Sequence, residues 1–191
     1  MKIEIAKDIV KPHLTTARYE HSLRVAETAK ELALLYGEKV EKAELAAVFH
    51  DYAKYRSRDE LARWIVTSYL PKDLLDYHHE LWHGPVAALL IEKEFGVKDI
   101  DIQNAIHYHT TGRAHMSNLE MIIFLADYIE PGRKFTGIDK VREMAKVDLV
   151  HACLMASANT IRFLMNKNTA IYPDTFHTYN DLIRRVNGGN H

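Results

Sequence analysis

An apolar helical run, Leu45–Phe49, ends abruptly in two adjacent residues that can both bind a metal ion, His50 and Asp51. Adjacent residues on an α-helix point about 100° apart, because the helix has 3.6 residues per turn. Both side chains can therefore reach inward only where the end of this helix meets a cavity between other helices. A buried carboxylate without a partner is costly, and a divalent cation is one partner that would offset the cost. An isolated His-Asp pair is more often a core histidine beside a solvent-facing aspartate, so the rest of the chain has to decide.

Apolar residues recur at helical spacing along most of the chain, and Gly or Pro separates many of the runs. No alternating pattern bounded by hairpin turns predicts a β-strand, and there is no internal repeat or low-complexity linker. We therefore predict one all-α domain over residues 1–191, a helical bundle with a core at about 15–130 and C-terminal helices at 137–187 packing on it. The expected helices are residues 2–11, 16–36, 40–51, 59–69, 85–95, 100–107, 119–129, 149–165 and 179–186.

Composition limits the classes of protein to consider. The 191 residues are 47% hydrophobic and 27% charged with a net charge of −1, which is typical of a globular protein and does not favour binding to nucleic acid or an anionic membrane. The single cysteine, Cys153, excludes an intramolecular disulfide and a multi-cysteine zinc site. No apolar run approaches the roughly 18 residues of a membrane span, and residues 1–5 do not resemble a signal peptide. We expect a cytoplasmic protein.

Side chains that can bind a metal recur near the expected helix ends: His21, His50, Asp51, His83, His109 and Asp127. Asp127 is the most informative, because it interrupts an apolar helix where a lone carboxylate is costly. Imidazole and carboxylate ligands in this ratio suit iron, manganese or zinc better than calcium. Two carboxylates and four imidazoles are too many for one site with an open position, but they fit two metals bridged by one carboxylate.

Each of these residues also has a purely structural explanation. Asp127 could pair with Arg133, His83 could simply begin a helix, and His109 could be one of several loop histidines. His21 alone is weak evidence, because histidines on solvent-facing helix surfaces are common. The case for a metal site therefore rests on the residues taken together.

The order His21, His50-Asp51 and Asp127 resembles the H…HD…D signature of the HD-domain metal-dependent phosphohydrolases. His83 and His109 fall where the dinuclear branch of that superfamily supplies its extra ligands. Four phrases resemble, more closely, the bacterial HD-domain symmetrical bis(5′-nucleosyl)-tetraphosphatase family (the YqeK family): His50–Lys54, His83–Ala87, His109–Arg113 and Leu125–Pro131. The resemblance implies an HD-type helical bundle that hydrolyses diadenosine tetraphosphate to two ADP, with iron as its metal.

The chemistry of the candidate ligands can also be argued directly. Asp51 bridging two cations would hold them about 3.5–4 Å apart, the spacing of two-metal phosphoryl-transfer sites. One metal would take His21, His50, Asp51 and Asp127, and the other Asp51, His83 and His109. A metal-activated water would be the nucleophile. We expect two divalent ions per chain, with manganese, cobalt and zinc as alternatives to iron, and catalytic roles for Asp51, Lys54 and Asp127.

Phosphate oxygens need further partners, since the chain has no glycine-rich phosphate loop of the P-loop type. The predicted phosphate-binding residues are Lys54, Thr110, Arg113 and Arg133, which lie near the candidate ligands in sequence. The alternative for the three cations is a solvated surface charge, and for Thr110 it is a hydroxyl that caps its loop.

Two other functions remain open at this point. One is an HD-type hydrolase of another nucleotide, such as a nucleoside di- or triphosphate, a monophosphate or a cyclic dinucleotide. The other is a non-catalytic module that binds a nucleotide, which would predict a lost ligand. In every case the expected partner is a small nucleotide. The apolar faces of the first and last expected helices could also support a homodimer, although packing in the interior explains them equally well.

Overall fold

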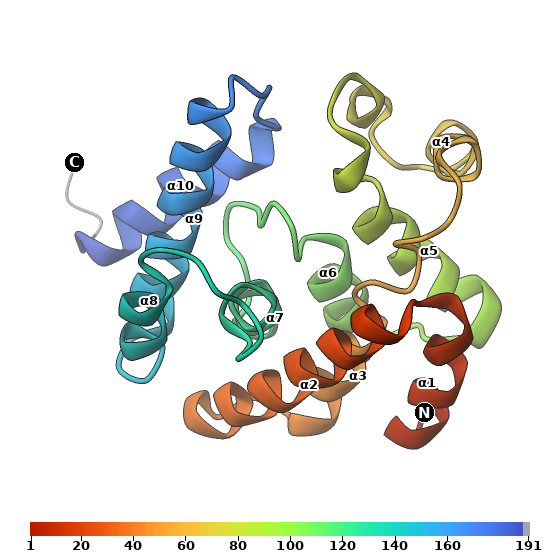
Figure 1. Ribbon diagram of the computed structural model, residues 1–191, viewed down its shortest axis with the longest axis horizontal. Coiled ribbons are helices and arrows are strands. Elements are labelled where there is room, and N and C mark those ends of the chain that lie inside the picture. Colours follow the sequence, from red (N-terminus) through yellow and green to blue (C-terminus); the bar gives the residue numbers. More distant parts are fainter. Residues whose placement is uncertain (189–191) are drawn as a thin grey trace.

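The computed structural model describes residues 1–188, and the regular structure within them is entirely helical (Figure 1). The all-α prediction is confirmed, while the last three residues of the expected 1–191 domain lie outside the described residues. Three short 3-10 helices are η1 (Lys11–His13), η2 (Lys72–Asp76) and η3 (His79–Leu81). The α-helices are α1 (Ile3–Val10), α2 (Thr16–Tyr36), α3 (Val40–Phe49), α4 (Arg58–Thr67), α5 (His83–Phe95), α6 (Ile100–His107), α7 (Asn118–Ile129), α8 (Ile138–Met144), α9 (Leu149–Asn166) and α10 (Pro173–Val186).

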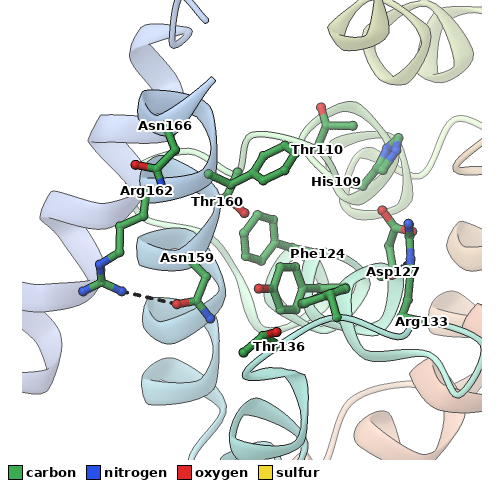
Figure 2. A pocket seen from close by; sticks show the side chains of 13 residues that line it. His109, Thr110, Phe124, Asp127, Arg133, Thr136, Asn159, Thr160, Arg162 and Asn166 are labelled. Carbon is green, nitrogen blue, oxygen red and sulfur yellow. Dashed lines mark hydrogen bonds and ion pairs between the residues drawn. The ribbon is translucent and has the colours of Figure 1, made fainter. Parts of the chain in front are cut away.

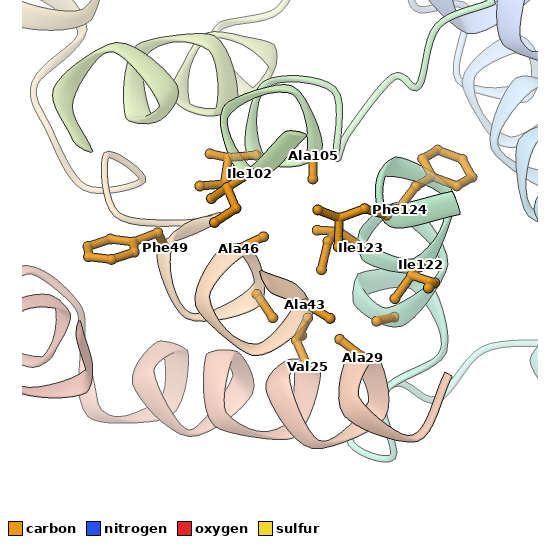
Figure 3. Close-up of a cluster of buried hydrophobic side chains, with 14 of the residues drawn as sticks. Val25, Ala29, Ala43, Ala46, Phe49, Ile102, Ala105, Ile122, Ile123 and Phe124 are labelled. Carbon is orange, nitrogen blue, oxygen red and sulfur yellow. The ribbon is translucent and has the colours of Figure 1, made fainter. Parts of the chain in front are cut away.

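Two helices, α3 and α7, form the centre of the bundle. Helix α3 contacts α1, α2, α6 and α7, and α7 contacts α2, α3, α6, α8 and α9. The side chains of Ala46 and Phe49 on α3 and of Ile122 and Ile123 on α7 are buried in one cluster (Figure 3). A helix that is apolar on nearly all sides is stable only when other helices surround it. This burial explains why an isolated polar residue on α7, such as Asp127, is so conspicuous.

Local signals place several helix ends where the sequence predicts them. The Thr15 side chain accepts a hydrogen bond from the Arg18 amide and caps α2. Gly37 ends that helix in the left-handed conformation, with φ = 70°, which glycine adopts without strain. Ser117 and Glu120 form a reciprocal capping box at the start of α7.

Several boundaries differ from the prediction, most of them by one or two residues, α8 is not among the expected helices, and two of the differences are informative. Helix α3 ends at Phe49 instead of residue 51, so His50 is its C-cap and Asp51 lies in the following turn. The last helix begins at Pro173 instead of residue 179, with the proline in its first turn, where its missing N–H costs nothing. The apolar pattern did not predict the first part of α10, because the buried residues there include two polar ones, Thr175 and Thr178.

The C-terminal helices cover one side of the bundle. Helix α9 packs on α7, α10 packs on α9, and Figure 1 shows α8, α9 and α10 gathered beside α7. Among the described residues, no helix combines the length and the apolar character needed to cross a membrane. Residues of α7 and α9 line a cavity between these two helices.

Candidate active site

All six predicted metal ligands converge at the centre of the bundle although they come from five separate segments. His21 lies on α2, and His50 and Asp51 follow directly from α3. The other three lie at the start of α5, just after α6 and near the end of α7: His83, His109 and Asp127. Five of these side chains are buried, and that of Asp127 is 17% exposed.

The two carboxylate oxygens of Asp51 face different imidazoles. Its Oδ2 lies 3.0 Å from His50 Nε2 and 3.7 Å from His21 Nε2, whereas its Oδ1 lies 3.1 Å from His83 Nε2. His83 Nε2 is in turn 3.1 Å from His109 Nε2. Asp51 is therefore placed between two groups of nitrogen donors, where its carboxylate could contact more than one metal ion.

Asp127 completes the first of these groups. Its Oδ1 lies 3.1 Å from His21 Nε2 and 4.0 Å from His50 Nε2. The Arg133 guanidinium also donates a hydrogen bond to this carboxylate at 2.6 Å, so the pairing that offered a structural explanation for Asp127 exists alongside the histidine contacts. His21, His50 and Asp127 offer ligand atoms within 4.8 Å of one another, as do His50, Asp51 and His109.

The opposite ring nitrogens of two of the histidines are engaged by backbone carbonyl oxygens. His50 Nδ1 lies 2.5 Å from the Ala47 carbonyl oxygen, and His109 Nδ1 lies 2.7 Å from the Ile106 carbonyl oxygen. A carbonyl only accepts, so each Nδ1 carries the proton and donates it, which leaves Nε2 with a lone pair directed at the cluster when the ring is neutral. This is the arrangement that orients metal-binding histidines in proteins.

Several buried atoms in this cluster lack a well-aligned hydrogen bond within the described part of the chain. They are His21 Nε2, His50 Nε2 and both carboxylate oxygens of Asp51. Buried polar atoms rarely remain unsatisfied, and these four lie together in one cluster. Imidazole nitrogens and carboxylate oxygens are ligands of divalent transition metals, so the residues present fit a metal centre.

The electrostatics of the cluster keep its carboxylates ionised. Burial raises the pKa of Asp51, but His50 and His83 outweigh that effect and hold it well below its usual range. Burial raises the pKa of Asp127 as well, but the adjacent His21 imidazole and the charges of His50 and Arg133 outweigh it and hold this pKa well below its usual range. Burial lowers the pKa of His109, which favours the neutral imidazole that binds metals.

Two neighbours of the cluster were missed by the sequence analysis. Glu130 is buried and lies 3.1 Å from His21 Nδ1 through its Oε1. Arg18 forms an ion pair with Asp51 Oδ2 without well-aligned hydrogen-bond geometry. A signal existed, because each is three residues from a ligand and thus on the same helical face: Arg18 precedes His21, and Glu130 follows Asp127.

The predicted phosphate-binding residues have different surroundings. Thr110 and Arg133 line a cavity that also contains His109 and Asp127, and Lys54 lines a second cavity with His83 while pairing with Glu80. Arg113 instead makes a bidentate ion pair with Glu120, with distances of 2.5 and 3.0 Å. Its guanidinium has a structural partner, so its role in phosphate binding stays a prediction that the geometry does not support.

A sequence profile of the HD domain family matches residues 18–132, which include all six converging residues. The chain belongs to the HD domain family. Its curated relatives include proteins named "Bis(5'-nucleosyl)-tetraphosphatase, symmetrical" from Halalkalibacterium halodurans, 53% identical over 93% of this chain and 95% of that protein, and from Bacillus subtilis, 50% identical over 96% and 98%. The resemblance inferred from the sequence phrases is confirmed.

A solved HD domain structure has the same fold. The crystal structure of a predicted HD superfamily hydrolase involved in NAD metabolism, from Clostridium acetobutylicum, superposes with a TM-score of 0.91 at 39% identity, covering 97% of this chain and 98% of that one. HD domain phosphohydrolases bind divalent metals, and the His and Asp groups of this chain can hold such an ion.

Proposed function

We propose that this HD domain protein hydrolyses diadenosine tetraphosphate symmetrically, to two molecules of ADP. The observation that carries the proposal is the position of Asp51, whose two carboxylate oxygens face separate groups of imidazoles in a buried cluster. The dinucleoside tetraphosphate substrate follows the name of relatives up to 53% identical over nearly the whole chain, and the choice of adenosine follows the family resemblance. All six expected ligands are present, which disfavours a non-catalytic module.

The ligand set suggests two divalent ions per chain. The first would be held by His21, His50, Asp51 and Asp127, and the second by Asp51, His83 and His109. We propose iron as the metal, and the same donors also accommodate manganese, cobalt or zinc. Such a pair of ions, when bound, supplies an activated water for attack on phosphorus and positive charge for the phosphate oxygens.

The protein's own residues would orient the ligands and the substrate. Glu130 holds the His21 ring through Nδ1, and the carbonyls of Ala47 and Ile106 hold His50 and His109 in the same way. Arg133 lies against Asp127 and lines the adjoining cavity, where its planar guanidinium can bind phosphate oxygens.

Two further side chains complete the proposed phosphate-binding set. Lys54 contributes charge beside His83, and Thr110 contributes a hydroxyl beside His109. We assign catalytic roles to Asp51, Asp127 and Lys54, because they would contact the ions or the reacting phosphates.

The position of cleavage is the decisive test. Attack at the second phosphate from a bound nucleoside releases ADP from each half, whereas a shift of one phosphate gives ATP and AMP. The reaction is run in oxygen-18 water with metal-loaded protein, and the first products are identified by mass spectrometry. One oxygen-18 atom in one of the two ADP molecules supports the proposal, and ATP with AMP contradicts it.

Three other expectations stay predictions. A homodimer is tested by light scattering; Ala6 and Val10 on α1 and Leu182 on α10 are fully buried in the single chain, so part of both apolar faces already serves the core. The division into a core at 15–130 and packing helices at 137–187 requires truncation experiments. A cytoplasmic location requires fractionation of cells.

A further inference from the structure

Two cavities with different linings reach the ligand cluster. The first, which we call the α7–α9 cavity, has a volume of about 750 Å³ and is lined by His109 and Asp127 among others. The second, which we call the basic cavity, has a volume of about 360 Å³ and is lined by His83. The two sets of lining residues have no member in common. A substrate that crosses the cluster would therefore meet two unlike surroundings.

The α7–α9 cavity has the size and the walls of a nucleoside site. Its volume lies within the range of about 300–1,000 Å³ that is usual for small-molecule pockets. Four aromatic side chains line it: Phe124, Tyr128, Phe135 and Phe163. Phe135 and Phe163 are 42% and 56% exposed. Exposed aromatic rings that border a cavity are suited to stack on a nucleobase.

The polar groups of this cavity are divided between its two sides. Figure 2 shows His109, Asp127 and Arg133 on one side and Asn159, Arg162 and Asn166 of α9 on the other, with Phe124 between them. Imidazole and carboxylate groups and the Arg133 guanidinium suit metal ions and phosphates, whereas amide side chains both donate and accept as the edges of a nucleobase require. Arg162 also carries a guanidinium, but it donates a hydrogen bond of 3.3 Å to Asn159 Oδ1 (Figure 2). The cavity thus has a phosphate end at the cluster and a base end at α9.

The basic cavity is smaller and offers more charge than stacking surface. Its cationic lining residues are Lys54, Arg56 and Arg58, and its lining includes one Phe, Tyr or Trp ring, Tyr55, which is 55% exposed, against four such rings in the α7–α9 cavity. Arg58 lies 3.2 Å from His79 through Nη2 and Nε2, so the two side chains are held together. A third cavity, which includes Thr110 and Tyr172, has a volume of about 170 Å³, below the usual range for a bound nucleoside.

We propose that this site recognises only one nucleoside of its dinucleotide substrate: the α7–α9 cavity binds one nucleoside, and the basic cavity binds the phosphates of the other half. The proposal rests on the proposed function. A symmetric substrate would then be bound asymmetrically, with its second nucleoside outside any enclosing pocket. The base end of the cavity is built by residues beyond the 18–132 match, so specificity comes from the C-terminal helices and metal binding from the HD domain.

The first experiment separates the nucleoside from its phosphates. Isothermal titration measures the binding of ADP and of inorganic diphosphate to manganese-loaded protein. In Phe163→Ala we expect the dissociation constant of ADP to rise at least tenfold, while that of diphosphate changes less than twofold, because only ADP carries a base to stack. Phe176→Ala is the matched control, since Phe176 is an exposed phenylalanine that does not line the cavity.

Other outcomes overturn the nucleoside site. Equal weakening of ADP and diphosphate would show a general disturbance of the cluster, and no weakening of ADP would show that the ring does not contact the base. Loss of ADP binding in the Phe176→Ala control would also overturn the nucleoside site, because Phe176 does not line the cavity. None of these binding measurements depends on hydrolysis. A failure of the proposed function would be seen as no cleavage of diadenosine tetraphosphate, and it is therefore distinguishable from a failure of the nucleoside site.

The second experiment tests recognition of one side only. Adenosine 5′-tetraphosphate carrying a methyl group on its terminal phosphate has the same charge as diadenosine tetraphosphate but lacks the second nucleoside. We expect a kcat/KM within fivefold of that for the dinucleotide, and ADP with methyl diphosphate as products. A larger loss in kcat/KM would show that the second nucleoside is also recognised and would overturn the proposal.

Discussion

His21 and Glu130 form a contact of 3.1 Å between Nδ1 and Oε1, although 109 residues separate them in sequence. Glu130 also accepts hydrogen bonds from Arg24 Nε and from the Gly132 amide, each at 2.6 Å. Burial opposes ionisation of this carboxyl, but Arg24 and the Gly132 amide outweigh burial and lower the pKa of Glu130. A charged, fixed carboxylate beside the ring orients His21 toward the cluster.

Glu130→Gln is therefore expected to weaken metal binding by about 10–100-fold, because loss of a group that orients a ligand typically has this effect. Metal affinity is measured by titration followed by elemental analysis. Glu27→Gln, at an exposed position on α2, is the control. Unchanged affinity in Glu130→Gln would show that the His21 contact has no role in orienting the ligand.

The number of bound ions tests the bridging role of Asp51. We expect two ions per chain after reconstitution with excess iron or manganese, none in Asp51→Ala, and one in His83→Ala or His109→Ala. Asp51 alone would contact both ions, whereas each histidine would contact one. Elemental analysis that finds one ion or fewer in the wild-type chain would contradict the dinuclear centre, and full metal content in a histidine variant would remove that residue from the ligand set.

Removal of metal should destabilise the protein, because a ligand that binds only the folded state stabilises it by mass action. At a free metal concentration 100 times the dissociation constant, the gain is about 2.7 kcal/mol. Thermal unfolding with and without a chelator measures the shift in Tm. The shift should nearly vanish in Asp51→Ala, and an equal shift in that variant would place the stabilising ion elsewhere.

Gly84 lies where α5 packs against the end of α6. A Cβ at this position would approach the carbonyl oxygens of His107 and Ile106 to 2.9 and 3.1 Å and His109 Nδ1 to 3.1 Å. Two of these atoms are backbone and cannot turn away, so Gly84→Ala should displace His109 and cost about 1–3 kcal/mol of unfolding free energy. Chemical denaturation and metal analysis test both effects.

Gly37→Ala provides the comparison for that experiment. A Cβ on Gly37 would meet no atom of the described residues within 4 Å, but the φ of 70° at this position disfavours alanine. The substitution should lower the free energy of unfolding by about 1 kcal/mol without changing metal content. Loss of metal in Gly37→Ala as well would show that general destabilisation explains the effect at Gly84.

Burial lowers the pKa of His107 to about 4, and the nearby Arg113 charge acts in the same direction. The unfolded chain takes up this proton near pH 6.5, whereas the folded chain does so near pH 4. Stability is therefore retained above pH 6.5 and lost as the pH falls from 6.5 to 4, by about 1–3 kcal/mol. Denaturation at both pH values should show a smaller loss in His107→Gln than in the wild type, with His177→Gln as a surface control.

Local interactions allowed the sequence to predict helix ends and a candidate ligand set. Gly37 and Ser117 mark boundaries through their own backbone and side-chain preferences, so neighbouring residues suffice to recognise them. His50, Asp51 and Asp127 could be predicted as candidate metal ligands because they interrupt apolar helical runs. The HD signature then joined these residues into one candidate centre, although it could not supply distances.

Only the tertiary structure decided which residues surround that centre. Asn159 and Phe163 lie on α9, far in sequence from His109, and they reach its cavity only because α9 packs on α7. Arg113 lies four residues from His109 in sequence, yet its guanidinium pairs with Glu120, because the first turn of α7 places that carboxylate beside it. Sequence separation does not determine side-chain contacts between helices, because these depend on how the buried faces pack.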